Sequence, residues 1–251
     1  MKVISVCNHK GGCAKTTSVV SIAAELVMQG KKVLIIDNDY QANLTSSIGI
    51  KPGQYSLVDC FKGDKTLKDI ILNCPTLENL DIVPCNLDYS NVDIAFATVK
   101  NNKVMLRDLI AKEKLDYDFI IIDCSPSLNL TVINALVASD SIIIPMEPSL
   151  FNVQGLGNLI KIIKMIQNGL NSKLKIEGIL LTRVDSRSKV VDEVRSELDE
   201  LFGDKIFDTV IHQSTSVVRS QLEGLPICLY EPRNKVVKEY EEIVKEILKN
   251  G

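Results

Sequence analysis

The sequence predicts an α/β protein in which a doubly wound, mostly parallel sheet is covered by helices on both faces. Three observations indicate this fold. Short apolar runs recur along the chain and are too continuous for strands with one exposed face. Segments with helical spacing of apolar residues separate these runs, and a glycine-bearing turn joins the first run to the first helical segment. Strands that alternate with helices favour parallel pairing.

The expected elements follow this alternation along the chain. Val3–Val6 is an apolar run that we expect to form a buried strand, and Val19–Val27 predicts the helix after it. Lys32–Asp37 predicts a second buried strand, while Pro52 and Gly53 indicate a turn. The later expected strands are Leu80–Pro84, Asp118–Asp123, Ser141–Pro145, Ile176–Thr182 and Lys205–Ile211. The later expected helices are Leu57–Phe61, Leu67–Leu72, Asp88–Thr98, Val104–Lys114, one containing Asn134, Val153–Gln167, Lys189–Phe202 and Asn234–Lys249.

The last of these helices has two interpretations. Its apolar residues form one stripe from Val236 to Leu248, which could face either a core or a membrane. Its polar face mixes basic and acidic side chains, unlike the strongly basic face of a membrane-surface helix. We therefore expect this helix to pack on the core, and membrane targeting is the alternative.

The composition suits a globular protein. The chain has 251 residues, of which 45% are hydrophobic and 24% charged, and it shows no internal repeat or low-complexity linker. We therefore expect residues 1–251 to form a single domain. The formal net charge is −3, so any binding to nucleic acid requires a local basic face.

The cysteines point to a reducing compartment. Seven cysteines are scattered along the chain without a C-x-x-C pair, which argues against a disulfide framework or a zinc site. No apolar run approaches the roughly 18–20 residues that a membrane-spanning helix needs. No signal peptide precedes the first expected strand. We therefore expect a soluble, cytoplasmic protein.

The turn after the first strand has the layout of a phosphate-binding loop. Gly11 and Gly12 let successive backbone N–H groups converge on an anion, and the following helix directs its positive dipole end to the same place. Lys15 adds a mobile charge, and Thr16 can offer its hydroxyl to a Mg²⁺ ion bound by the phosphates. The alternative is a glycine-rich turn with incidental lysines.

The residues from Lys10 to Thr17 fit the pattern K-G-G-x-x-K-T-T, the deviant Walker A motif. Random residue usage would match its six fixed positions in such a chain about once in 10^5. The sequence thereby resembles the ParA/MinD family of partitioning and positioning ATPases, and most closely its short ParA, or Soj-like, members. Asp37–Thr45 and Asp123–Pro126 resemble two further segments of that family. Ala14 replaces the loop glycine of most members, and Tyr40 replaces a proline.

This resemblance implies a P-loop NTPase that slowly hydrolyses ATP with Mg²⁺ and alternates between an ATP-bound homodimer and a monomer. Adenine is implied by the family alone. Lys10 would reach the nucleotide of the partner subunit, Lys15 would hold the β- and γ-phosphates, and Thr17 the α-phosphate. The implied nucleotide-binding residues are Lys10, Gly11, Gly12, Cys13, Ala14, Lys15, Thr16 and Thr17.

The resemblance also gives roles to three aspartates. Asp39 would orient or activate the attacking water and is, with Lys10 and Lys15, an implied catalytic residue. Asp37 and Asp123 would support the magnesium ion together with Thr16. In both loops the alternative is structural, because aspartates commonly cap turns.

The implied partners are nonspecific DNA, bound by the ATP dimer, and a ParB-like protein that triggers hydrolysis, which would place the protein on the nucleoid. Arg187, Lys189 and Arg219 are the candidate DNA contacts, although Gln213 and Ser216 stand where two arginines are usual. The alternative is a MinD-like positioning switch that recruits a protein or membrane-associated cargo without DNA. A nitrogenase-iron-protein-like reductase fits less well, since its paired cluster cysteines have no counterpart in the sequence.

Overall fold

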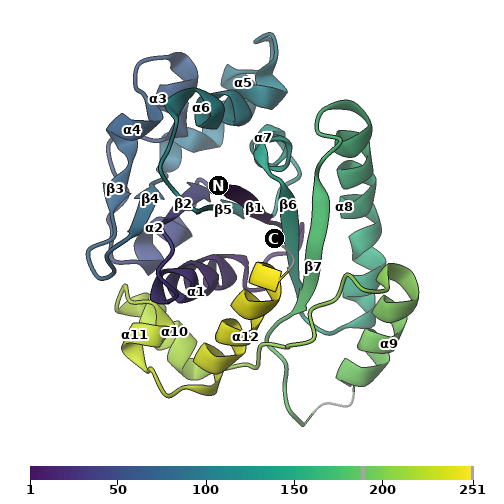
Figure 1. Ribbon diagram of the computed structural model, residues 1–251. Helices are drawn as coiled ribbons and strands as arrows, with labels where there is room; N and C mark the ends of the chain where they lie inside the picture. The colour runs from purple at the N-terminus through teal and green to yellow at the C-terminus, as the bar shows by residue number, and fades with distance from the viewer. Residues whose placement is uncertain (188–189, 250–251) are drawn as a thin grey trace.

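The computed structural model describes residues 1–187 and 190–249 and contains one seven-stranded sheet in the order β3-β4-β2-β5-β1-β6-β7 (Figure 1). Its strands are β1 (Lys2–Val6), β2 (Val33–Asn38), β3 (Leu72–Asn73), β4 (Leu80–Val83), β5 (Phe119–Cys124), β6 (Ser141–Met146) and β7 (Lys175–Leu181). All neighbours pair in parallel except β3, which is antiparallel to β4. The predicted mostly parallel sheet is therefore confirmed.

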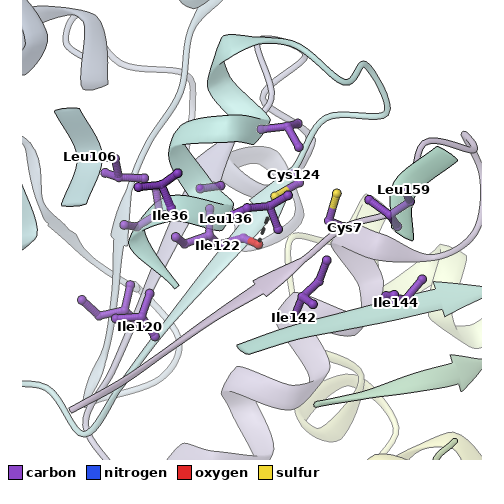
Figure 2. Packing of buried hydrophobic residues seen from close by; sticks show 14 of the residues in the cluster. Cys7, Ile36, Leu106, Ile120, Ile122, Cys124, Leu136, Ile142, Ile144 and Leu159 are labelled. Atoms are coloured by element: carbon purple, nitrogen blue, oxygen red, sulfur yellow. Dashed lines mark hydrogen bonds between the residues drawn. The ribbon is translucent and has the colours of Figure 1, made fainter. Parts of the chain in front are cut away.

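The central strands are apolar along most of their length because both of their faces are buried. Along β5, Ile120 and Ile122 point to one face, and Ile121 points to the other. Figure 2 shows Ile120 and Ile122 on the same side of the sheet as Ile142 and Ile144 of β6. This two-sided burial explains why the strands read as continuous apolar runs.

Helices on the first face supply the side chains that meet this isoleucine layer. They include α6 (Met105–Glu113), α7 (Leu130–Ala138), α8 (Leu150–Gly169) and α9 (Val190–Phe202). Leu106, Leu136 and Leu159 of the first three reach the layer in Figure 2. The predicted elements 104–114, 153–167 and 189–202 are thus confirmed to within a few residues, except that Lys189 lies outside the described residues.

The second face is covered by α1 (Lys15–Met28) and α12 (Lys235–Lys249), which lie side by side in Figure 1. Tyr240 and Ile243 of α12 are fully buried against this face. The prediction that the last helix packs on the core is therefore confirmed. None of the helices within the described residues combines the length and apolarity needed to cross a membrane.

The remaining helical segments are short. They are α2 (Asn43–Ser47), α3 (Leu57–Lys62), α4 (Leu67–Ile70), η1 (Leu87–Asn91), α5 (Val92–Ala95), η2 (Asn102–Val104), α10 (Thr215–Leu222) and α11 (Ile227–Tyr230). The sequence interpretation did not include α2, α10 or α11. Two of these three, α2 and α10, border the cavity described below.

The predicted strand Lys205–Ile211 is wrong. This segment runs beside β7 but, within the described chain, forms one isolated bridge to it, between Ile206 and Ile179. The backbone N–H groups of Asp208 and Thr209 donate to the Glu246 carboxylate of α12, at 3.0 and 3.2 Å. Because a side chain takes these donors, no continuous ladder to β7 forms.

Two predicted helices are shorter than expected. The helix predicted at 67–72 ends at Ile70, because Leu72 pairs with β4 as part of β3. The helix predicted at 88–98 divides into η1 and α5 and ends at Ala95. There the side-chain amide of Asn102 donates to the Phe96 carbonyl at 2.9 Å, so the backbone turns away from the helix.

Candidate active site

A cavity of about 700 Å³ lies where the carboxyl ends of β1, β2 and β5 meet. Three loops that were expected to converge line it: the glycine-bearing loop after β1, the loop after β2 and the turn after β5. Its lining residues in these loops include Gly11, Gly12, Ala14, Lys15, Thr16, Thr17, Asp39, Tyr40, Gln41, Ser125, Pro126 and Ser127. Ligands in open α/β sheets bind at this edge of the strands.

The glycine-bearing loop owes its shape to two left-handed residues. Gly12 has a φ of 76°, and Ala14 has a φ of 63° where it precedes α1. Glycine adopts this conformation without a steric penalty, whereas the Cβ of alanine makes it cost about 1 kcal/mol. The family's usual glycine at position 14 therefore has a structural reason, and this chain carries the strain.

Lys15 is buried beneath the loop, with only 8% of its surface exposed. Its Nζ donates to the Lys10 carbonyl at 2.9 Å and lies 3.9 Å from the Cys13 thiol. Burial raises the pKa of this thiol despite the nearby Lys15 charge. Cys13 is thus a neutral packing residue of the loop, and Lys15 is the group in the loop that supplies positive charge to the cavity.

Thr16 joins the loop to β5. Its hydroxyl donates to Oδ2 of Asp123 at 2.7 Å, while Oδ1 of Asp123 is buried without a hydrogen-bond partner. Burial and the neighbouring Asp37 carboxylate raise the pKa of Asp123 well above its usual range. A charged carboxylate is therefore disfavoured here until a cation or another donor reaches it.

Asp37 is held more completely than Asp123. Its Oδ2 accepts hydrogen bonds from the Thr45 backbone N–H and hydroxyl at 2.8 and 2.7 Å. Its Oδ1 accepts from the backbone N–H of Asp39 at 3.3 Å. Burial outweighs these bonds and raises the pKa of Asp37 to about 6. Thr45, which sequence reasoning did not single out, therefore fixes this carboxylate from α2.

These groups fit a magnesium ion that would be coordinated partly by the protein and partly by a bound phosphate group. Mg²⁺ prefers oxygen ligands and often takes only one or two of them from the protein, with the rest from phosphate and water. The unpartnered Asp123 oxygen beside the Thr16 hydroxyl offers such ligands. In the described parts of the chain, no cluster of three or more His, Cys, Asp or Glu side chains could hold a metal without a further ligand.

Asp39 is placed at the cavity surface. It is half-buried, it lines the cavity, and its Oδ1 accepts from the Gln41 backbone N–H at 3.1 Å. This hydrogen bond makes Asp39 a cap of its own turn, while its second carboxylate oxygen has the cavity in reach. Both interpretations of Asp39 are therefore compatible with its position.

Lys10 is directed away from the cavity that Lys15 occupies. Its Nζ donates to Oδ1 of Asn152 near the start of α8 at 2.7 Å. Asn152 is buried and in turn donates to the Glu147 carbonyl at 2.8 Å. Lys10 is accordingly not among the residues that line the cavity.

Two residues after β7 were missed by the sequence interpretation of the site. The Thr182 hydroxyl donates to the Cys13 carbonyl at 3.1 Å. Arg183, with a φ of 54°, donates to the Gly12 carbonyl at 3.3 Å and pairs with Glu147 at 2.9 Å. Arg183 lines the cavity, and its place directly after a predicted strand was the signal that could have identified it.

The far wall of the cavity comes from residues 211–222 and from α12. His212 is tied to Glu239 of α12 twice: its backbone N–H lies 2.9 Å from Oε2 and its Nδ1 lies 2.7 Å from Oε1. Val217 and Val218 give this wall an apolar surface, and Gln221 reaches Thr17.

Arg187 and Arg219, the candidate DNA contacts within the described residues, do not line this cavity. Arg187 is exposed and pairs with Asp185 at 2.9 Å in the same turn. Arg219 lies exposed on α10, and Lys189 falls outside the described residues. The structure therefore brings the phosphate loop and the aspartates together, but it does not gather these cations beside them.

Comparison with known proteins agrees with this geometry. A family described as an AAA domain matches residues 1–176. The sporulation initiation inhibitor protein Soj of Bacillus subtilis is 38% identical over 252 residues, covering 100% of this chain and 99% of the relative. The chromosome-partitioning ATPase Soj of Treponema pallidum is 34% identical over 247 residues, with coverages of 98% and 97%.

Solved structures are similar over nearly the whole chain. Cobyrinic acid a,c-diamide synthase from Mycobacterium smegmatis with a bound ATP analog and magnesium has a TM-score of 0.87 at 28% identity, covering 100% of this chain and 95% of that chain. The septum site-determining protein MinD from Pyrococcus horikoshii OT3, complexed with Mg-ADP, has a TM-score of 0.81 at 27% identity, with coverages of 99% and 96%.

Proposed function

Since the chain belongs to the ParA/MinD family of P-loop ATPases and to its Soj-like members, we propose that it is a Mg²⁺-dependent ATPase whose ATP-bound homodimer partitions DNA. The observation that carries this proposal is the cavity that unites Lys15, the Thr16–Asp123 pair and Asp39 at one edge of the sheet. ATP with Mg²⁺ is the nucleotide, in line with the ligands of the related structures.

The phosphate loop binds the triphosphate through its backbone. The N–H groups of Gly12, Cys13 and Ala14 donate to phosphate oxygens at the positive end of α1. Lys15 neutralises the β- and γ-phosphates, and Thr17 donates to the α-phosphate. The apolar wall at Val217 and Val218 supports placement of the nucleoside between α10 and the loop.

Thr16 and Asp123 would hold the magnesium ion, which would lower the charge on the transferred phosphoryl group. Thr16 would contribute its hydroxyl, and Asp123 would act through a water. The free oxygen of Asp123 supports this role. Asp37, with Thr45 and Asp39 already bonded to it, stabilises the aspartate loop rather than reaching the ion itself.

Asp39 orients the attacking water, because its carboxylate lies at the cavity surface on a turn that it caps itself. Phosphoryl transfer depends on positioning and charge neutralisation more than on covalent chemistry. A site that positions one water without covalent chemistry agrees with slow turnover. Slow turnover lets the nucleotide state act as a timer.

Lys10 completes the site of the partner subunit. In one chain its Nζ is held by Asn152, so dimerisation must exchange this hydrogen bond for the partner's phosphates. Two such lysines, one from each chain, neutralise charge at the enclosed nucleotides in the manner of an arginine finger. The ATP dimer then dissociates on hydrolysis, because each nucleotide has lost the γ-phosphate that attracted the Lys10 of the other chain.

The dimer binds nonspecific DNA, and a ParB-like partner triggers its release. The names of the Soj relatives support this function over others. Arg187, Lys189 and Arg219 are the candidate contacts, and a dimer doubles their number. A MinD-like positioning switch is the second candidate, favoured by the net charge of −3 and by the pairing of Arg187 with Asp185.

The first experiment compares binding of nonspecific duplex DNA at two salt concentrations in the apo, ADP and slowly hydrolysed ATP-analogue states. Wild type should bind only with the ATP analogue, and more weakly at high salt. Lys10→Ala should bind nucleotide but stay monomeric and lose DNA binding. Lys112→Ala, which removes an exposed lysine from α6, is the matched control and should behave as wild type.

The outcomes separate the two candidate functions. Dimerisation with the ATP analogue but no DNA binding in any state would favour the positioning switch and redirect the search to protein partners. A stable ATP dimer of Lys10→Ala would contradict the role of Lys10 across the interface. Absence of ATP binding by wild type would reject the proposed function as a whole.

A further inference from the structure

We propose that Gln221 is a positioning residue that turns the Thr17 hydroxyl toward the nucleotide. The inference rests on the proposed function, in which Thr17 donates to the α-phosphate. Gln221 stands at the end of α10, is half-buried, and lines the cavity opposite the phosphate loop. Its Nε2 donates a hydrogen bond to Oγ1 of Thr17 at 3.0 Å.

The direction of this hydrogen bond sets which way the Thr17 proton can point. A hydroxyl has a single proton and two acceptor lone pairs, whereas the amide nitrogen of glutamine is only a donor. When Thr17 accepts from Gln221, its own proton remains free for another acceptor. The cavity in front of Thr17 is where a phosphate oxygen is expected, so the amide leaves Thr17 oriented as a donor to an anion.

A backbone contact holds Gln221 in reach of Thr17. Gly224, two residues after the end of α10, has a φ of 66° and packs directly on Gly49. A Cβ atom at Gly224 would lie 2.5 Å from the Gly49 Cα and 2.7 Å from its nitrogen. This close approach fixes the end of α10 against the segment after α2. The backbone contact therefore sets the position from which the Gln221 side chain reaches Thr17.

The charge of the side chain matters as much as its length. Glutamine is neutral, so its amide donates to Thr17 without adding charge beside the phosphates. A carboxylate at the same position would accept the Thr17 proton, reverse the hydrogen bond and add a negative charge beside the phosphates. Gln221→Glu should therefore weaken ATP and ADP binding by about 10- to 100-fold.

A double-mutant cycle on the full chain tests the mechanism, with ATP and ADP binding measured calorimetrically in Mg²⁺. Gln221→Leu should weaken both nucleotides by about three- to tenfold, and equally, because both carry an α-phosphate. In a Thr17→Val background, Gln221→Leu should have no further effect, since Gln221 acts through the hydroxyl that is already gone. The unfolding midpoint of each variant checks that it is folded.

Gln213→Leu is the matched control, because it removes another amide from the same cavity wall. Any effect of Gln213→Leu on nucleotide-binding free energy should be additive with that of Thr17→Val. The role of Gln221 would be overturned if the effects of Gln221→Leu and Thr17→Val on the nucleotide-binding free energy were also additive. It would be overturned as well if Gln221→Leu bound the nucleotides with wild-type affinity. If Gln221→Glu does not fold, the cycle alone decides. Failure of wild type to bind ATP would instead reject the proposed function.

Discussion

The three aspartates of the site differ in how much of each carboxylate is already used. Asp37 accepts hydrogen bonds at both oxygens, whereas Asp123 has one buried oxygen without a partner. Asp39 uses one oxygen for its own turn and faces the cavity. A carboxylate can act on a ligand only if one of its oxygens is not already used in a hydrogen bond. Asp39 and Asp123 meet this condition, whereas Asp37 does not.

Asp39 allows a sharp test at this scale. Asp39→Ala and Asp39→Asn should both bind ATP and dimerise, and both should lose turnover, because neither side chain can act as a base toward water. Asparagine keeps an acceptor for the Gln41 N–H, so it preserves the turn. Steady-state hydrolysis and analytical ultracentrifugation measure the two properties. Recovery of turnover by asparagine would show that Asp39 only caps the turn.

Among the elements, α12 does more than cover a hydrophobic face. The Glu239 carboxylate holds His212 at the cavity wall, and Glu246 takes the backbone donors of Asp208 and Thr209. Tyr240 also shares a hydrogen bond with Ser18 of α1 at 3.1 Å. The last helix therefore shapes the segment beside β7 and one wall of the site.

The contact between α1 and α12 also predicts a pH dependence of stability. Glu25 of α1 is only 7% exposed, and burial, with the charge of Glu241 on α12, raises its pKa from 4.5 to about 7. A carboxyl with a raised pKa binds more protons folded than unfolded. The contribution of protonated Glu25 to the free energy of unfolding is therefore fully present below about pH 4.5 and is lost as the pH rises through about 7.

Chemical denaturation at pH 5 and pH 8 checks this expectation. Wild type should lose on the order of 2 kcal/mol of unfolding free energy between these values through Glu25. Glu25→Gln should match wild type near pH 5 and be more stable at pH 8. Glu242→Gln, on the exposed face of α12, is the control and should keep the wild-type dependence. Equal slopes for wild type and Glu25→Gln would refute the assignment.

At the scale of the whole molecule, the cavity joins distant parts of the chain. Its near side is the loop before α1, and its far side is formed by residues 211–222 and α12. Arg183 and Thr182 connect β7 to the same loop. We infer that residues 1–251 act as one domain, because neither half contains a complete site.

Ligand binding should therefore stabilise the whole fold. At 100 times its dissociation constant, Mg²⁺ with an ATP analogue should add about 2.7 kcal/mol, which corresponds to a rise in the unfolding midpoint of about 5–10 °C. Thermal denaturation followed by circular dichroism measures this rise. Lys15→Ala should lose it, because the buried charge that meets the phosphates is absent, whereas Lys112→Ala should keep it. An equal rise in Lys15→Ala would place the nucleotide elsewhere.

Much of the fold could be predicted because its signals are local. Strands buried on both faces must be largely apolar, as 119–122 and 142–144 are, and helices between them must carry apolar stripes. The segment at 205–211 was misassigned because its partner, the Glu246 carboxylate, lies in an element far along the chain. A strand pattern cannot reveal that a side chain takes its backbone donors.

Consecutive residues alone reveal the phosphate loop, the succession of the main strands along the chain and the three aspartates, because a motif and the end of an apolar run are local features. Which groups face one another depends on tertiary packing, as for Gln221 and Thr17, His212 and Glu239, and Arg183 and Gly12. These contacts join residues separated by 27 to 204 positions, and their hydrogen bonds depend on side-chain geometry that only packing fixes.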